Sequence, residues 1–243
     1  MTPISRTVAM TLIVLAVLLS SSRAGSAEWF ADVYAGASVT RDHDVTIHDA
    51  VVGQGIYRDV EFATTQAYGA RLGHYFDRLP FLGLAADLFT FSPNIRPQAA
   101  RRDGCFLVTG CGSGESRTGR IDIDAYALSL DLMLRLPLFK TAEEPHGLLQ
   151  PYLALGVPLF VTTVTPRSTR QFRNQDDETD VSVGYKGAVG VAFRIFSNLD
   201  LFGEYRYTHT STSVDLRDAV IRNASFDTEL NTHSFLLGLS ARW

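Results

Sequence analysis

The segment AYALSLDLMLRLPL, residues 125–138, alternates strictly between apolar and mixed side chains. One face carries Tyr126 and then a leucine at every second position. The other face carries Ser129, Asp131 and Arg135. Alternation with a period of two is typical of a β-strand whose two faces meet different surroundings. The segment therefore predicts a strand with one uniformly apolar face.

Seven further segments show the same alternation, with no convincing helical pattern between them. They are residues 29–39, 67–76, 81–91, 151–162, 181–196, 199–209 and 233–243. Pro158 falls inside one of them, where a proline fits poorly in a central strand, so a bulge or local distortion is expected there. The chain is therefore predicted to form eight strands.

The connections between these segments alternate between long and short. The long, polar gaps lie at roughly 41–61, 95–120, 164–180 and 210–229, the tight ones at 77–80 and 195–198, and an intermediate one at about 137–149. Long external loops and short periplasmic turns are the mark of an outer-membrane barrel. We therefore predict an all-β fold, an eight-stranded antiparallel up-and-down transmembrane β-barrel with four long external loops. The even strand count places both chain ends on the periplasmic side.

The amino terminus has the order of a secretory signal peptide. Arg6 precedes an apolar stretch at residues 8–19, and small residues follow. That stretch is shorter than the ~20 residues of a membrane-spanning helix. We predict that residues 1–27 are a signal peptide cleaved after Ala27, and that residues 28–243 are one barrel domain in the bacterial outer membrane. An uncleaved membrane anchor is the alternative.

The charge of the predicted mature chain excludes one class of partner. Arg6 and Arg23 lie in the predicted signal peptide, which contains no acid, so 20 of the 22 basic residues remain against 26 acidic ones. A mildly acidic chain is not a general nucleic-acid binder. No cofactor is predicted.

The chain has two cysteines, Cys105 and Cys111, in the segment DGCFLVTGCGSG. Export places them in an oxidising compartment, which predicts a local disulfide. A metal-binding pair is the alternative, but no histidine or third cysteine stands nearby to complete such a site.

Charged residues within the strands fall on the face opposite the apolar one. They are Asp32, Arg71, Asp87, Asp131, Arg135, Lys186, Glu204, Arg206 and Arg242. Eight strands enclose a space that side chains can fill, and opposite charges can pair there. We predict a structural charge network that locks the lumen. A narrow pore for small solutes is the alternative, and a soluble β-sandwich or lipocalin-like barrel is the alternative for the fold.

Three segments carry a family resemblance: PYLALGVP at 151–158, LFGEYRYTH at 201–209 and LLGLSARW at 236–243. The chain resembles the small eight-stranded outer-membrane barrels, the OmpA-like membrane domain and its OmpX-like relatives. The last segment resembles the signal read by the barrel assembly machinery, with Gly238 and Trp243 in the matching positions and Ala241 in place of a bulky residue.

The resemblance is specific for the class of protein and weak for function. We predict a monomeric barrel with a structural or surface-interaction role and no enzymatic activity, because loops on a rigid scaffold often carry function. The expected partners are outer-membrane lipid and lipopolysaccharide, the barrel assembly machinery, and an extracellular ligand held by the loops.

A hydrolase is the alternative function. His209 and Ser211 share the outward parity of their strand, and Glu229 on the next strand lies close in a hairpin. A serine, a histidine base and an acid form a nucleophile arrangement. The group loosely resembles the outer-membrane lipid A deacylases, which carry Asn after the serine where this chain has Thr212.

The long gaps also contain clusters of charged residues. The first gap holds His43, Asp44, His48 and Asp49, and the third holds Asp176, Asp177, Glu178 and Asp180. Both are interpreted as solvated loop residues. A divalent metal site is the alternative for the first, and the spacing of a calcium-binding loop is absent from the third. No metal site is predicted.

Overall fold

A computed structural model describes residues 28–41, 43–49, 53–106, 110–117, 120–140, 147–166, 178–216 and 224–243. The strands are β1 (Glu28–Thr40), β2 (His43–Asp49), β3 (Gly53–Val60), β4 (Thr65–Phe76), β5 (Leu79–Phe91), β6 (Ala99–Phe106), β7 (Gly110–Arg117), β8 (Ile121–Arg135), β9 (Leu149–Pro166), β10 (Glu178–Val183), β11 (Tyr185–Phe196), β12 (Leu199–Leu216) and β13 (Ala224–Arg242). Within these ranges, no helix is long and apolar enough to cross a membrane.

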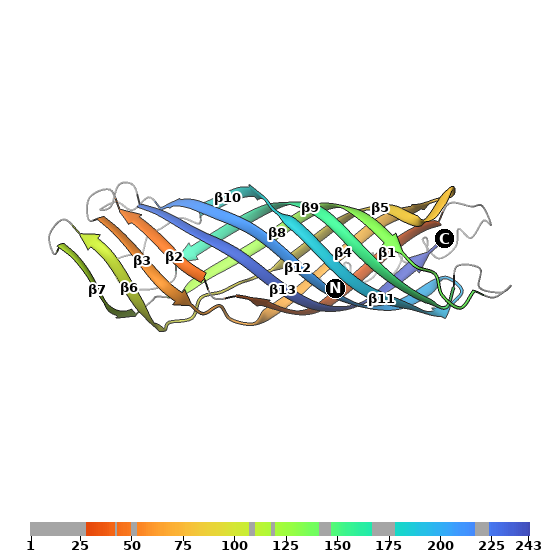
Figure 1. The fold of residues 1–243 in the computed structure, drawn as a ribbon, viewed down its shortest axis with the longest axis horizontal. Coiled ribbons are helices and arrows are strands. Elements are labelled where there is room, and N and C mark those ends of the chain that lie inside the picture. The colour runs from red at the N-terminus through yellow and green to blue at the C-terminus, as the bar shows by residue number, and fades with distance from the viewer. Residues whose placement is uncertain are drawn as a thin grey trace, which may run out of the picture.

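Eight of the strands form a closed ring. Each pairs with the next in the order β1, β4, β5, β8, β9, β11, β12 and β13, and β13 pairs back with β1. All of these pairings are antiparallel. Figure 1 shows the tilted strands wrapped into a long barrel. Each ring strand contains one of the eight predicted segments, of which 181–196 begins on β10, so the predicted fold is confirmed.

The other strands continue the ring strands past one end of the barrel. Pairing of β5 with β8 reaches Phe91 and Ala125, and pairing of β6 with β7 begins at Ala99 and Arg117. Phe91 and Ala99 are eight residues apart, and so are Ala125 and Arg117. The pairing register of β5 with β8 therefore continues unchanged into that of β6 with β7. β2 also continues β1 along β13, but here the register shifts by one. Between the pair Thr40–Thr232 and the pair Thr46–Asp227, the β1–β2 segment has one residue more than β13, as in a β-bulge.

These continuations correct part of the sequence prediction. The gaps 41–61 and 95–120 were expected to be loops, but they contain β2 and β3 in the first and β6 and β7 in the second. We call β2, β3, β6 and β7 the outer sheet. Its strands pair in the order β2, β3, β6 and β7, and β2 also pairs with the ring strand β13. The outer sheet forms the end of the molecule opposite the chain's carboxyl terminus (Figure 1).

A bulge or local distortion was expected at Pro158, and the structure shows a local interruption of the ladder without a bulge. The ladder is interrupted at Gly184, opposite this proline, but Val183 pairs with Leu159 and Lys186 with Gly156 in one unchanged register. The Gly184 N–H donates to the Pro158 carbonyl oxygen at 2.9 Å. Pro158 has no N–H to donate back to Gly184, so one backbone hydrogen bond of this pair is missing. The pairing on both sides of it keeps the same register.

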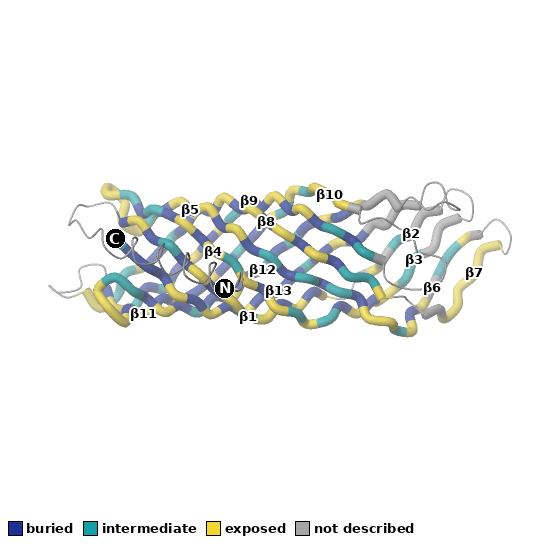
Figure 2. Tube along the Cα trace, turned by 180° about the vertical axis from the view of Figure 1, so that it is seen from behind, coloured by how far each residue is buried: buried dark blue, intermediate teal, exposed yellow. Residues whose placement is uncertain are grey.

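The two faces of the ring strands have opposite character. On β8, the outward Leu130 is 73% exposed, whereas its neighbours Ser129 and Asp131 are buried. Figure 2 shows this alternation along the strands of the barrel. A belt of exposed leucine and valine suits lipid, because the lipid-facing surface of a membrane barrel is apolar.

The interior changes character toward the outer sheet. A cluster that we call the apolar cap fills the lumen there. It consists of Val60, Phe62, Ile95, Ala100, Ile123, Val164 and Leu230. Apolar side chains also point inward at the level of the belt, where Phe30, Phe89, Phe160 and Phe202 pack beside the buried charges.

Candidate functional site

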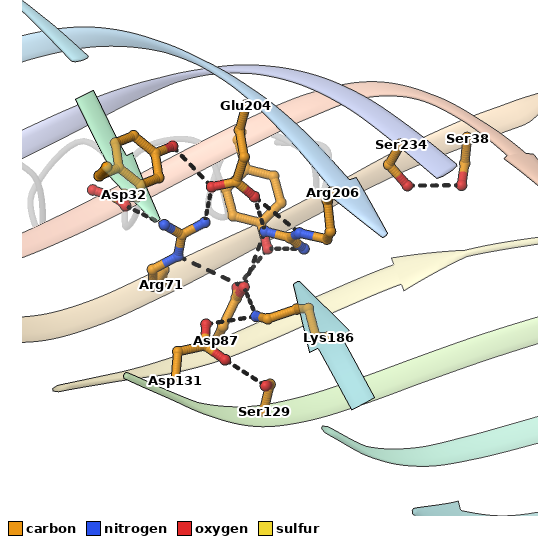
Figure 3. A network of polar contacts seen from close by, with 12 residues as sticks. Asp32, Ser38, Arg71, Asp87, Ser129, Asp131, Lys186, Glu204, Arg206 and Ser234 are labelled. Carbon is orange, nitrogen blue, oxygen red and sulfur yellow. Dashed lines mark hydrogen bonds and ion pairs between the residues drawn. The ribbon is translucent and has the colours of Figure 1, made fainter. Parts of the chain in front are cut away.

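Seven charged side chains meet in the middle of the lumen, and we call them the central cluster (Figure 3). They are Asp32, Arg71, Asp87, Asp131, Lys186, Glu204 and Arg206. They come from six of the eight ring strands, and β12 contributes both Glu204 and Arg206. All seven are buried.

Ion pairs connect the central cluster across the lumen. The Lys186 ammonium bridges Asp87 at 2.6 Å and Asp131 at 2.5 Å. The Glu204 carboxylate accepts from Arg71 at 2.5 Å and pairs with Arg206 at 2.8 Å. Arg206 also reaches Asp87 at 3.0 Å. Each carboxylate of these pairs therefore has a cation within contact distance, which is what a buried charge requires.

Two tyrosines complete this network. The Tyr34 hydroxyl donates to Asp87 at 2.5 Å, and the Tyr152 hydroxyl donates to Glu204 at 2.8 Å. The Arg206 guanidinium lies 4.7 Å from the centre of the Tyr34 ring. These rings fill the space between the charges and use their polar ends to bind the carboxylates.

A second group lies near the tight turns, and we call it the end cluster: Glu28, Arg135, Gln150, Arg194, Asp200 and Arg242. Arg135 contacts Glu28 at 2.5 Å, and Arg242 contacts Asp200 at 2.6 Å. Arg242 also donates to the Gln150 side-chain oxygen at 2.6 Å. The end cluster occupies the lumen beside the seam between β1 and β13.

All nine charged residues expected in the lumen lie in these two clusters. The prediction omitted Glu28, Arg194 and Asp200, which are also buried. The alternation of residues already placed these three on the inward face. They lie beside strand ends and turns, however, where a charged side chain is usually in contact with water. With them, the buried charges among the described residues number six acids and six bases.

Little space remains between the clusters. A cavity of about 10 Å³ is lined by residues of both, including Asp32, Arg71 and Arg242. That volume is about enough for one water molecule. At this level, side chains fill the lumen.

The proposed catalytic residues point outward. Ser211 pairs with Glu229 across β12 and β13, and His209 pairs with Asn231. The His209 Nδ1 shares a 2.6 Å hydrogen bond with the Asn231 side-chain oxygen, and its ring stacks on Tyr185 at 4.7 Å. A triad needs the histidine between the nucleophile and the acid. Here the carboxylate stands beside the serine, and an amide that the sequence analysis missed orients the histidine.

The outer sheet carries exposed ion pairs. Arg58 on β3 contacts Asp103 on β6 at 2.5 Å and Asp44 on β2 at 3.6 Å. The hydrogen bond from Arg58 lowers the pKa of Asp103 below its ordinary value of 3.8. A disulfide joins Cys105 and Cys111, which face each other across β6 and β7.

Several predicted features lie outside the described residues. They are the signal peptide at 1–27, Asp176, Asp177, and the side chains of His43, His48, Asp49 and Glu178. Within the described part of the chain, no group of three His, Cys, Asp or Glu residues is placed to hold a metal ion.

The closed ring, the apolar belt and the charged lumen together define the class: an eight-stranded transmembrane β-barrel. The chain belongs to the family described as outer membrane protein beta-barrel domain, which matches residues 12–242. This membership places the protein in the bacterial outer membrane. None of the curated proteins compared matches the sequence.

The solved structures to which this chain is similar are distant in sequence. OprG from Pseudomonas aeruginosa is 14% identical with a TM-score of 0.54, over 90% of this chain and 96% of that one. Neisserial surface protein A is 13% identical with a TM-score of 0.46, over 90% and 99%. Ail, the attachment invasion locus protein of Yersinia pestis, is 11% identical with a TM-score of 0.39, over 90% and 99%. At these identities the likeness concerns the fold alone.

Proposed function

We propose that this protein is a non-enzymatic, non-conducting anchor that holds the outer sheet above the membrane for contact with an extracellular ligand. The observation that carries the proposal is the continuation of the ring strands into the outer sheet above a lumen filled by paired charges. A surface built on a rigid scaffold is a frequent place for recognition. The disulfide near the tip of the β6–β7 hairpin braces that surface.

Conductance in planar bilayers tests the non-conducting part. Inserted protein is expected to leave the bilayer silent, because both clusters block the lumen. A matched variant, Arg206→Ala with Glu204→Ala, removes one base and one acid from the central cluster and is expected to open a measurable leak. Steady conductance of the unaltered protein would establish the narrow pore instead.

Mass spectrometry of lipid A tests the non-enzymatic part. Overexpressed protein is expected to leave lipid A acylation unchanged, because Glu229 stands beside Ser211 and not beside His209. Loss of an acyl chain that Ser211→Ala abolishes would establish the hydrolase.

Assembly and oligomeric state belong to the same proposal. Gly238 and Trp243 are proposed to be read by the barrel assembly machinery, and the inserted barrel is proposed to be a monomer surrounded by lipid and lipopolysaccharide. Deleting Trp243 is expected to lower the amount of heat-modifiable, inserted protein, since this residue closes the seam with Trp29. Normal amounts after the deletion would contradict the assembly role.

A further inference from the structure

We propose that the outward face of β1, β11, β12 and β13, near the outer sheet, binds one phosphorylated glycolipid of the outer leaflet. Polar side chains there would hold its phosphorylated disaccharide, and a shallow strip on β1 would hold an acyl chain. The inference rests on the proposed anchoring in the outer membrane, and it names the lipid partner by its chemistry.

A row of polar side chains runs from strand to strand across four neighbouring strands, along the direction of the backbone hydrogen bonds. Tyr185 on β11 pairs with His209, and His209 pairs with Asn231 on β13. The Arg41 N–H, just beyond β1, donates to the Asn231 carbonyl oxygen at 2.9 Å. We call Tyr185, His209, Asn231 and Arg41 the polar row. Its neighbours nearer the barrel centre on the same strands include Val189 and Phe235, which belong to the lipid belt.

Hydrogen bonds hold the polar row in place. The Asn231 side-chain oxygen accepts from the Tyr207 hydroxyl at 2.8 Å and contacts His209 at 2.6 Å. One level lower, the Tyr205 hydroxyl and the His233 Nδ1 lie 2.6 Å apart. Tyrosine is common at the membrane interface. Outward arginine, asparagine and histidine are not typical of the lipid belt, and Arg41, Asn231, His209 and His233 are such residues. They offer hydrogen-bond donors and a cation to a phosphorylated headgroup.

The width of the polar row favours a large headgroup. Neighbouring strands lie about 4.8 Å apart, so three spacings from Tyr185 to Arg41 cover roughly 14 Å. A single phosphate group would contact side chains on only two or three neighbouring strands, which is one or two strand spacings. A disaccharide with phosphates attached uses the full row, and the tyrosine rings present flat apolar faces to its sugars.

A shallow strip lies on β1 below the polar row, where Ala35 and Ala37 stand between the larger outward side chains Val39, next to Arg41, and Val33. Ala37 pairs with Phe235, and Ala35 pairs with Leu237 on one side and with Tyr68 on the other. Phe235 is 61% exposed, Leu237 is 68% exposed and Tyr68 is 57% exposed, so these side chains stand out on both sides of the two alanines. A low strip between two ridges fits a hydrocarbon chain, which stays in contact with apolar surface along its length.

Native mass spectrometry of the folded full-length protein in detergent tests the proposal. The probes are bisphosphorylated lipid A, monophosphorylated lipid A and phosphatidylglycerol. The unaltered protein is expected to retain one bisphosphorylated lipid A, the monophosphorylated form more weakly, and phosphatidylglycerol least. Arg41→Gln with His209→Gln is expected to weaken retention by at least about tenfold, because two donors to the phosphorylated headgroup change.

A second variant tests the shallow strip independently of charge. Ala37→Leu is expected to weaken retention by about fivefold or more, because it fills the space for the acyl chain. The matched controls are Arg78→Gln in the β4–β5 turn and Ala86→Leu on the outward face of β5, and both are expected to bind like the unaltered protein. Heat-modifiable mobility on a gel verifies that each variant is folded.

Three results would overturn the inference. The first is equal retention by all variants, which means general lipid contact without a site. The second is retention of phosphatidylglycerol as strong as that of lipid A, which means a simple phosphate site. The third is loss of binding in the two control variants. Each of these leaves the conductance and lipid A acylation results unaffected, so this inference fails separately from the proposed function.

Discussion

The interior of the barrel inside the membrane and the interior beneath the outer sheet are filled differently. Along β8, the inward side chains are in turn Arg135, Met133, Asp131, Ser129, Ala127 and Ala125, and finally Ile123 in the apolar cap. The strand keeps its parity throughout. Inside the membrane, the lumen holds buried charges together with apolar and aromatic side chains, whereas the apolar cap consists of hydrophobic residues.

The two regions also use ion pairs differently. The side chains of Lys186 and Asp131 are fully buried, whereas those of Arg58 and Asp103 are 47% and 26% exposed. Breaking a buried pair leaves a charge without compensation, but water replaces the partner of an exposed one. The lumen is therefore the region where a single charge change has the greatest effect on stability.

The largest expected effect follows from removing one charge from the central cluster. Glu204→Gln keeps the side-chain shape but takes the negative partner from Arg71 and Arg206. The free energy of unfolding is expected to fall by about 3–5 kcal/mol. Urea unfolding of protein inserted in lipid vesicles measures the change.

The matched variant restores the charge balance. Glu204→Gln with Arg206→Met removes one acid and one base, so it is expected to be more stable than Glu204→Gln alone. If Glu204→Gln unfolds at the same urea concentration as the unaltered protein, the central cluster does not contribute to stability as described.

The next effect compares one outward substitution in the two regions. Leu130→Arg places a charge in the lipid belt and is expected to cost about 2–4 kcal/mol near the bilayer midplane. Ser113→Arg places the same charge on exposed β7 and is expected to stay within about 0.5 kcal/mol of the unaltered protein. Unfolding in vesicles measures both. Equal costs at the two positions would show that Leu130 does not face lipid.

A smaller effect is expected in the apolar cap. Ile95→Ala leaves a cavity where the cap meets the lumen, at a cost of about 2 kcal/mol. Hydrogen exchange should rise in β3 and β6 and stay unchanged in the belt. Val181→Ala, an outward control on β10, should leave the exchange of β3 and β6 unchanged. Faster exchange throughout the barrel would show that the two regions do not open separately.

The smallest effect is a pH response confined to the outer sheet. The pKa of Asp103 is lowered by Arg58, so the ionised carboxylate stabilises the β3–β6 pairing above pH 3.8. This contribution is lost as the pH falls through the lowered pKa. Hydrogen exchange in β3 should therefore rise slightly on acidification, and Asp103→Asn should remove that rise. An unaltered pH response in Asp103→Asn would assign it to another group.

The sequence predicted the ring strands because lipid imposes an unbroken apolar face on each of them. It did not predict β6 and β7, since AARRDGCF and GCGSGESR are polar on both faces and resemble loops. The role of Asn231 was not predicted for the same reason, because it is a polar residue among other polar residues at the end of the barrel near the outer sheet. Its partnership with His209 depends on the register of β12 and β13, which the alternation of residues does not determine.

The backbone bonds between Trp29 and Trp243 have a consequence for the order of events during biogenesis. The seam that they belong to joins Ala31 to Ala241, so β1 pairs on that side with β13, which is the most distant of the ring strands along the chain. Until β13 is paired, β1 carries a free edge, and such an edge is a template for pairing with another chain. A version of this polypeptide without β13 is therefore an open sheet exposed to misassembly, and the interval before closure is its most vulnerable period.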